Sequence, residues 1–167
     1  MTQSKTIILG IIISVFLALS SCTKKSGTSG ESGTASNDIL IGEVGSLTGS
    51  EASFGVSTRQ GVDMAIEEVN SKGGINGRKL RVIVMDDQGK PEEAAIAVTK
   101  LITQDRVAAI LGEVASSRSL AMAPIAQAHQ VPMVTPASTN PKVTQVGNFI
   151  FRICFIDPFQ GSVMASF

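Results

Sequence analysis

The segment VAAILGEVASSRSLAMAPIAQAHQVPMVT, residues 107–135, joins two short apolar runs through a stretch with helical periodicity. The first run, 107–112, predicts a buried strand, and a helix is expected from about Ser116 to His129. One face of this helix should point inward, formed by Leu120, Ala121, Pro124, Ile125 and Ala128. A strand, a helix and a second strand in this order predict a crossover between two parallel strands.

The same alternation extends outward on both sides of this segment. The other expected strands are residues 39–44, 79–87, 131–139 (a short strand followed by a loop) and 149–155, and the other expected helices are residues 58–71 and 91–104. The helix over 58–71 should carry four apolar side chains on one face, Val62, Ala65, Ile66 and Val69. Strands that alternate with helices predict the α/β fold class, a parallel sheet flanked by helices on both faces.

Three loops that follow predicted strands are rich in small and hydroxyl-bearing residues: GSLTGSEASFG (45–55), GEVASS (112–117) and TPASTN (135–140). Such sheets bind ligands at the carboxyl ends of their strands. Ser116 and Ser117 lie where the helix after the third strand begins. A serine there can cap the helix, which is worth about 1 kcal/mol, or it can help the helix N-terminus to bind an anion. The residues alone leave both interpretations open.

Composition argues against several function classes. The chain has 14 Lys plus Arg and 14 Asp plus Glu, which gives no basic face for nucleic acid. The single histidine, His129, is expected at a solvent-facing helix end, without partners for a metal site or a hydrolytic serine. The glycines after the first strand lack G-x-G-x-x-G spacing, and Asp86 and Asp87 are interpreted as strand-end and turn residues. We expect no enzyme, metal or cofactor; a nucleotide-binding enzyme is the remote alternative.

Residues 1–21 have the features of an export signal: Lys5 near the start, an uncharged apolar run, and small residues before Cys22. The position of Cys22 resembles a bacterial lipobox, which predicts lipidation of its thiol and a membrane anchor in the cell envelope. The alternative is an uncleaved transmembrane helix, because the uncharged run is nearly long enough to span a bilayer. Residues 22–37 are dominated by glycine and serine and predict a flexible tether.

Near the other end, Asp157 and Pro158 are typical of a helix start, so a further helix is expected to begin there. The sequence stops at Phe167 inside this pattern, and we expect it to be a fragment of a longer product. Cys154 lies in an apolar run and is expected to be a buried small hydrophobe.

Four stretches together resemble the leucine/isoleucine/valine-type periplasmic binding proteins, which are the substrate-binding components of ABC importers. They are GSLTGSEASFG, GVDMAIEEVNSKGGINGRKLRVIVMDDQGKPEEA, AILGEVASSRSLAMAPIAQAHQVPMVTPAST and FIFRICFIDPFQG. The resemblance covers about residues 39–161 and implies the first lobe of a two-lobed type I periplasmic-binding-protein fold. In that picture residues 38–153 form the ligand-binding lobe, and 154–167 form the hinge crossing and the start of the second lobe.

The resemblance also implies a function. A branched-chain or other amino acid, or a related small molecule, would be captured between two lobes that close about a hinge. The partners would be the permease and ATPase subunits of an ABC importer, and no nucleic acid. A ligand-sensing receptor module and an amide- or urea-binding protein share this fold and stay open as alternatives. The ligand-binding residues that the resemblance implies are Phe54, Ser116, Ser117, Ala137, Ser138 and Thr139.

The roles of these residues follow from the family as well. Ser116 and Thr139 correspond to residues that hold the ligand's charged groups, Ala137 would act through its backbone carbonyl, and Phe54 would wall the pocket. Some family members carry a disulfide whose two positions are Gly89 and Ala115 in this chain. The resemblance therefore implies that packing makes these loops rigid here.

Overall fold

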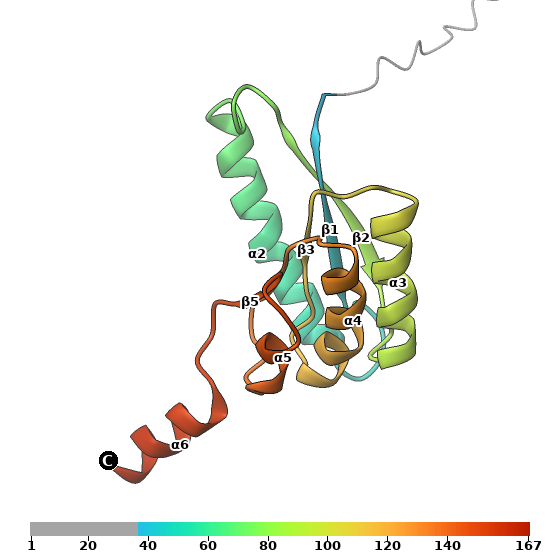
Figure 1. Cartoon of the computed structure of the whole chain (residues 1–167). Helices are drawn as coiled ribbons and strands as arrows, with labels where there is room; N and C mark the ends of the chain where they lie inside the picture. Colours follow the sequence, from blue (N-terminus) through green and yellow to red (C-terminus); the bar gives the residue numbers. More distant parts are fainter. Residues whose placement is uncertain (1–36) are drawn as a thin grey trace, which may run out of the picture. The chain divides into compact units, whose positions relative to one another are not determined.

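Five parallel strands form one sheet in the computed structural model, which describes residues 37–167 (Figure 1). The strands are β1 (Ile39–Gly45), β2 (Leu80–Asp86), β3 (Ala109–Leu111), β4 (Met133–Thr135) and β5 (Ile150–Arg152). Their order in the sheet is β2-β1-β3-β4-β5, so the direction of the connections reverses between β1 and β3. This reversal is the switch point at which α/β sheets open a crevice for ligands. The predicted fold class is confirmed.

Helices connect the strands in the expected alternation. They are α2 (Ala52–Ser71), α3 (Pro91–Thr103), α4 (Ser116–Ala128), the short α5 (Lys142–Gln145) and α6 (Asp157–Ala165). The starts of α3, α4 and α6 agree with the sequence, and α5 lies in a stretch without a predicted element. Pro91 opens α3, and Glu92 and Glu93 complement the helix dipole in its first turn.

The prediction that α2 begins near Thr58 is wrong, because the helix starts six residues earlier, at Ala52. A tertiary contact explains the longer helix. A Cβ on Gly55 would lie 2.1 Å from the carbonyl oxygen of Ser46, so only glycine lets this turn pack against the end of β1. Local sequence gave no sign of this contact, since serine and glycine are typical of loops.

The hydrophobic core lies on the face of the sheet that α3 and α4 cover. Ile110, Met133 and Ile150 extend from three neighbouring strands into it and are nearly inaccessible to solvent. The helices contribute Ala94, Ala97, Val98, Leu101, Met122, Ala123 and Ala126. The alanines let α3 and α4 approach closely, and apolar burial of this kind stabilises the fold by about 25 cal/mol per Å².

The buried face of α4 differs from the predicted one. Pro124 and Ala128 are exposed, and the residues actually buried are Arg118, Ser119, Met122, Ala123 and Ala126. Positions 119, 122, 123 and 126 follow the same i, i+3, i+4, i+7 spacing as the predicted set, so periodicity alone could not choose between the two faces. The face that is buried is the one that packs against the small residues of α3.

Among the described helices, α2 lies on the opposite face of the sheet, over β1 and β2 (Figure 1). An ion pair of 2.8 Å joins Arg59 Nη1 of α2 to Glu43 Oε2 of β1. The side-chain amide of Asn70 makes two 2.8 Å hydrogen bonds with the backbone of Leu80. The four apolar residues predicted on one face of α2, Val62, Ala65, Ile66 and Val69, do share a face along a groove, and they are half-buried or exposed.

The C-terminal elements carry much exposed apolar surface. β5 is shorter than the predicted 149–155, and Cys154 is half-buried instead of buried. No residue of α6 is buried, and the helix lies apart from the sheet (Figure 1). Within residues 37–167, no helix combines the length and the apolar character needed to cross a membrane. The predicted signal segment, Cys22 and nearly all of the predicted tether lie outside the described residues.

Candidate functional site

The loops that leave the carboxyl ends of β1 to β4 meet at one edge of the sheet, which we call the rim (residues 46–51, 86–90, 112–117 and 136–141). Hydrogen bonds cross between these loops. The Ser46 hydroxyl lies 2.8 Å from Asp87 Oδ1 and 2.8 Å from Glu113 Oε1, and the Thr135 hydroxyl donates to the Glu113 carbonyl over 2.8 Å. The three hydroxyl-rich loops singled out in the sequence are therefore brought together.

The N-terminus of α4 lies on the rim without a side-chain cap. Its N-cap residue is Ala115, whose side chain cannot accept a hydrogen bond, and Ser116 already belongs to the helix. Ser116 Oγ accepts a hydrogen bond of 3.2 Å from the amide of Asn140, and Ser117 is exposed. The capping interpretation of these serines is not realised. The backbone N–H groups of the first turn lack intrahelical acceptors and can serve a ligand.

The loop after β4 presents some of its predicted residues to solvent and uses another internally. Ala137 is exposed and Thr139 is half-buried. Ser138 is fully buried, and its hydroxyl lies 3.1 Å from the Glu113 carbonyl, 3.0 Å from the Val114 carbonyl and 2.8 Å from Ser119 Oγ. The Ser138 side chain therefore stabilises the rim from inside and is closed to solvent.

Arg152 of β5 forms hydrogen bonds with the backbone of this loop. Its guanidinium donates to the carbonyls of Ser138 and Asn140 over 2.8 and 2.9 Å. At the outer end of the loop, the amide of Asp157 donates to the Thr139 carbonyl over 3.1 Å. The exposed and half-buried loop residues are thus fixed by contacts on both sides.

Phe54 reaches the same edge from α2, and its side chain is 63% exposed. It walls a recess of about 230 Å³ beside the start of α4. The lining residues are Ser46, Glu51, Phe54, Glu113, Val114, Ala115 and Arg118. The structure therefore places an aromatic side chain next to the uncapped helix N-terminus.

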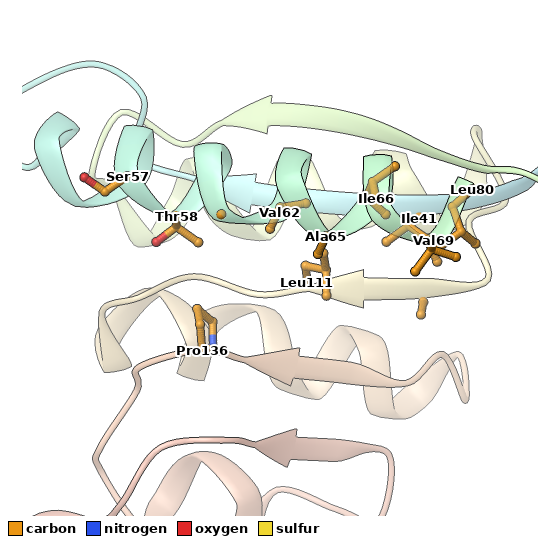
Figure 2. A pocket seen from close by; sticks show the side chains of 12 residues that line it. Ile41, Ser57, Thr58, Val62, Ala65, Ile66, Val69, Leu80, Leu111 and Pro136 are labelled. Carbon is orange, nitrogen blue, oxygen red and sulfur yellow. The ribbon is translucent and has the colours of Figure 1, made fainter. Parts of the chain in front are cut away.

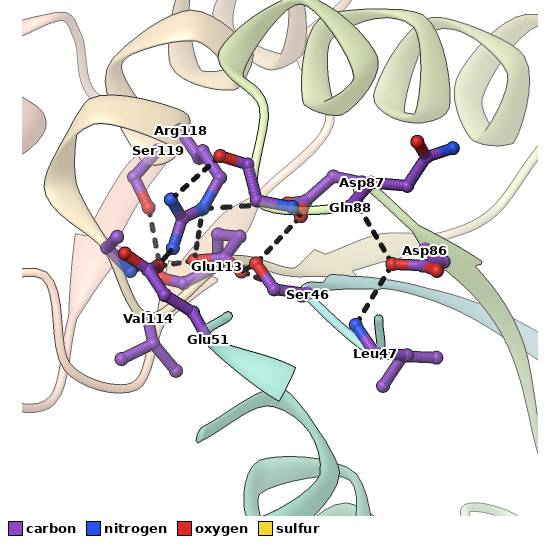
Figure 3. Close-up of polar contacts among 12 residues, drawn as sticks. Ser46, Leu47, Glu51, Asp86, Asp87, Gln88, Glu113, Val114, Arg118 and Ser119 are labelled. Carbon is purple, nitrogen blue, oxygen red and sulfur yellow. Dashed lines mark hydrogen bonds and ion pairs between the residues drawn. The ribbon is translucent and has the colours of Figure 1, made fainter. Parts of the chain in front are cut away.

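Beneath the recess lie four polar residues that we call the rim cluster: Ser46, Asp87, Glu113 and Arg118 (Figure 3). Each is at most 5% exposed. Arg118 Nε lies 3.1 Å from Glu113 Oε2, and its Nη2 pairs with Glu51. The predicted site residues did not include Ser46, Glu113 or Arg118. The available signal was Glu113, a carboxylate placed directly after a buried strand.

Burial and neighbouring charges shift the pKa of two residues of the rim cluster, Asp87 and Arg118. Burial raises the pKa of Asp87 more than the hydrogen bonds from Gly89 N–H and the Ser46 hydroxyl lower it, and the Glu113 charge adds to the rise. Burial disfavours the Arg118 cation, but its bonds to Glu51 and Glu113 outweigh this and raise its pKa. Arg118 therefore stays charged and compensates the carboxylates around it.

Asp86 has a different role from its neighbour. Burial alone would raise its pKa, but hydrogen bonds from the Thr48 hydroxyl and from the amides of Gln88, Leu47 and Thr48 lower it. The carboxylate accepts from the Thr48 hydroxyl over 2.6 Å and from the Leu47 amide over 2.9 Å. The prediction that Asp86 and Asp87 are strand-end and turn residues is confirmed.

Gly89 and Ala115, the positions that correspond to a disulfide in some relatives, are tied here by polar contacts. The Gly89 amide donates to Asp87 Oδ1 over 2.8 Å, and its carbonyl accepts from Arg118 Nη1 over 3.2 Å. The Ala115 amide donates to Glu113 Oε2 over 2.7 Å. Hydrogen bonds and ion pairs, and not packing alone as predicted, hold these loops.

A second concave surface lies between α2 and the sheet and reaches the rim only at Pro136 (Figure 2). This groove has a volume of about 560 Å³ and is larger than the recess. Its lining is apolar except for the hydroxyls of Ser57 and Thr58, with Val62, Ile66 and Leu111 among the contributors. Charged ligand groups would lose water there without gaining partners, so the rim is the better site for a polar ligand.

The described residues hold no cluster of three or more His, Cys, Asp and Glu side chains arranged to bind a metal ion. His129 is exposed at the C-cap of α4, as predicted. The groups that the rim offers to a small molecule are backbone amides, hydroxyls and an aromatic side chain.

A parallel sheet with a switch point, an uncapped helix N-terminus and a walled recess at one edge defines an α/β domain built to bind a small molecule. Comparison with known families specifies which one. The chain belongs to the periplasmic binding protein family, whose model matches residues 38–161. Membership places the chain among extracytoplasmic binding proteins and not among enzymes.

Solved structures and characterised proteins agree with this membership. A leucine binding protein, LivK from Thermotoga maritima, is 46% identical with a TM-score of 0.73, over 77% of this chain and 36% of that chain. LivJ from Streptococcus pneumoniae, a branched-chain amino acid transporter substrate binding protein solved with isoleucine, is 32% identical with a TM-score of 0.74, over 77% and 37%. A leucine-, isoleucine-, valine-, threonine- and alanine-binding protein from Pseudomonas aeruginosa is 37% identical over 134 residues, which is 80% of this chain and 36% of that protein. The chain thus spans little more than a third of the length of these relatives.

Proposed function

We propose that this chain is the first lobe of an extracytoplasmic solute-binding component of an ABC importer, and that its ligand is a branched-chain or other amino acid. The observation that carries the proposal is the uncapped N-terminus of α4 beside the recess walled by Phe54. A carboxylate on the amides of Ser116 and Ser117 would gain hydrogen bonds and the favourable end of the helix dipole. The binding partners named for LivJ and for the Pseudomonas protein support an aliphatic amino acid.

The remaining ligand contacts come from the loop after β4. Thr139 would contribute its hydroxyl, and Ala137 its exposed backbone carbonyl, to the charged end of the ligand. Ser138 would act indirectly, because its hydroxyl holds the carbonyls of Glu113 and Val114. The hinge crossing and the start of a second lobe would follow in residues 154–167, and closure of two lobes would bury the ligand.

The setting of the protein is part of the same proposal. Lipid on Cys22 would anchor it to the cell envelope, and the glycine- and serine-rich residues 22–37 would let the lobe reach its partners. Those partners would be a membrane permease and an ATPase, which would receive the captured ligand and drive its import.

Calorimetric titration with leucine, isoleucine and valine, and with urea and short amides as a second panel, tests the proposal. We expect binding of an amino acid that Ser116→Ala weakens about threefold to tenfold, the effect of one lost hydrogen bond. Thr139→Ala should have a similar effect. Ser57→Ala is the matched control, because its hydroxyl lies in the apolar groove and not at the rim. Binding that responds to Ser57→Ala and not to Ser116→Ala would contradict the site, and preference for urea or amides would contradict the ligand class.

A further inference from the structure

The rim cluster connects the loops after β1 and β2 with the peptide that leads into α4. Glu113 accepts hydrogen bonds from the Ser46 amide over 2.9 Å and from the Ala115 amide over 2.7 Å, one on each carboxylate oxygen. Arg118 reaches the Gly89 carbonyl with Nη1 and pairs with Glu51 through Nη2. One buried ion pair thus fixes the loop after β1, the loop after β2 and the peptide that leads into α4 (Figure 3).

Arg118 faces two buried carboxylates, and the distances identify its main partner. Its Nε lies 3.1 Å from Glu113 Oε2 but 3.9 Å from Asp87 Oδ2. The Ser46 hydroxyl bridges the same two residues, at 2.8 Å from Asp87 Oδ1 and 2.8 Å from Glu113 Oε1. Glu113 is therefore the carboxylate through which Arg118 reaches the loops.

The position of the ion pair explains why it matters for α4. Arg118 belongs to the first turn of α4, and Glu113 lies just before the N-cap residue Ala115. Their pairing bends the chain so that the Ala115 amide is satisfied by Glu113, while the next amides of the helix stay directed to the rim. The pairing between Arg118 and Glu51 also fixes the start of α2, three residues before Phe54.

We propose that Arg118 is a positioning residue for ligand binding: through Glu113 and Glu51 it sets the anion-binding end of α4 against the aromatic wall. This inference rests on the proposed function for its ligand. Its structural part, that Arg118 orders the rim loops, does not depend on the ligand. The ligand assignment and the role of Arg118 can therefore fail separately.

The test compares Arg118→Met with Arg59→Met in the whole chain. Arg59 is a suitable control, since it also pairs with a buried glutamate, Glu43, but lies on α2 away from the rim cluster. The probes are L-leucine and L-leucinamide, which differ only in the carboxylate that α4 would bind. We expect Arg118→Met to weaken leucine binding at least tenfold while leucinamide binding changes less than threefold. A purely structural role would weaken both probes equally, and that result would overturn the proposal.

Amide hydrogen exchange gives a second readout that needs no ligand. Exchange at Ala115, Ser46 and Gly89 should accelerate at least tenfold in Arg118→Met relative to Arg59→Met, at equal distance below each variant's Tm. Arg118→Lys should recover part of the protection, because it keeps the charge but loses the fork that reaches Gly89. If the wild-type chain binds no leucine, exchange alone decides whether Arg118 orders the rim. Equal exchange in the two methionine variants would overturn the proposal in either case.

Discussion

The two faces of the sheet are stabilised by different chemistry. On the α3 and α4 face, apolar side chains such as Leu101, Ile110 and Met122 are completely buried. On the α2 face, the helix is held by the Arg59–Glu43 ion pair and the Asn70 bonds to Leu80, while its apolar residues line an open groove. The first face therefore contributes most of the apolar burial that stabilises the domain, whereas the second is held mainly by polar contacts.

Neighbouring residues of β3 give the largest contrast between the faces. Ile110 is fully buried under α3 and α4, and Leu111 lines the groove on the other side. We expect Ile110→Ala to lower the free energy of unfolding by about 2–5 kcal/mol, because it leaves a cavity in a packed core. Leu111→Ala should cost less than about 1.5 kcal/mol, since its side chain is only partly buried. Denaturant unfolding of both variants measures this, and equal losses would remove the distinction between the faces.

The ion pair of the α2 face should give the next largest effect. Arg59→Ala leaves Glu43 without its cation, and we expect a loss of about 1–3 kcal/mol at pH 7, below the range for fully buried pairs because Arg59 is partly exposed. Burial raises the pKa of Glu43 more than the Arg59 hydrogen bond and charge lower it. Since a neutral Glu43 needs no cation, the loss should shrink as the pH falls toward 4.

A surface ion pair on the same helix is the control for this variant. Lys72→Ala breaks the exposed pair with Glu68 near the C-terminal end of α2 and should cost no more than about 0.5 kcal/mol. Unfolding curves of both variants at several pH values provide the comparison. A loss in Arg59→Ala that stays constant with pH would show that Glu43 is not the group responsible.

A substitution in the rim cluster, at Asp87, should have the smallest effect on the free energy of unfolding. Because burial raises the pKa of Asp87, the folded state keeps its proton to higher pH than the unfolded chain, where the pKa is about 3.9. The associated stability is present below that value and is lost as the pH rises through the folded-state pKa. Asp87→Asn keeps nearly the same shape as the aspartate but cannot ionise.

We therefore expect Asp87→Asn to be as stable as the wild type at pH 7, or more stable by up to about 1 kcal/mol. Its stability should also change less between pH 4 and pH 7 than that of the wild type, as thermal unfolding across this range would reveal. Clear destabilisation at pH 7 would mean that the ionised form of Asp87 is the one the fold requires.

The fold was largely predictable because α3 and the first two strands have strong periodicity with clear boundaries such as Pro91. Two features were not. Periodicity identified the apolar face of α2 but could not say what covers it, and α4 contains two overlapping sets of residues with helical spacing. In both helices the outcome depends on which neighbours pack against them.

The site was predictable only in part, for a related reason. Ser116 and the loop after β4 were found because small and hydroxyl residues gathered after predicted strands. Glu113 and Arg118 were missed because charged residues beside a loop usually face solvent, and only the folded chain shows that they bury each other. Ser138 was assigned to the ligand through its neighbours, although its own hydroxyl points inward.

The hydrogen bond between the Asp157 amide and the Thr139 carbonyl has a mechanical consequence. It joins the segment that leads into α6 to Thr139. The next residue, Asn140, donates its backbone amide to the Ser116 hydroxyl. Residues 153–157 cannot pivot about this point without lengthening that bond or carrying Thr139 along. Two hydrogen bonds and the peptide bond between Thr139 and Asn140 thus connect the segment before α6 to the start of α4, so a displacement of this segment would also move Ser116.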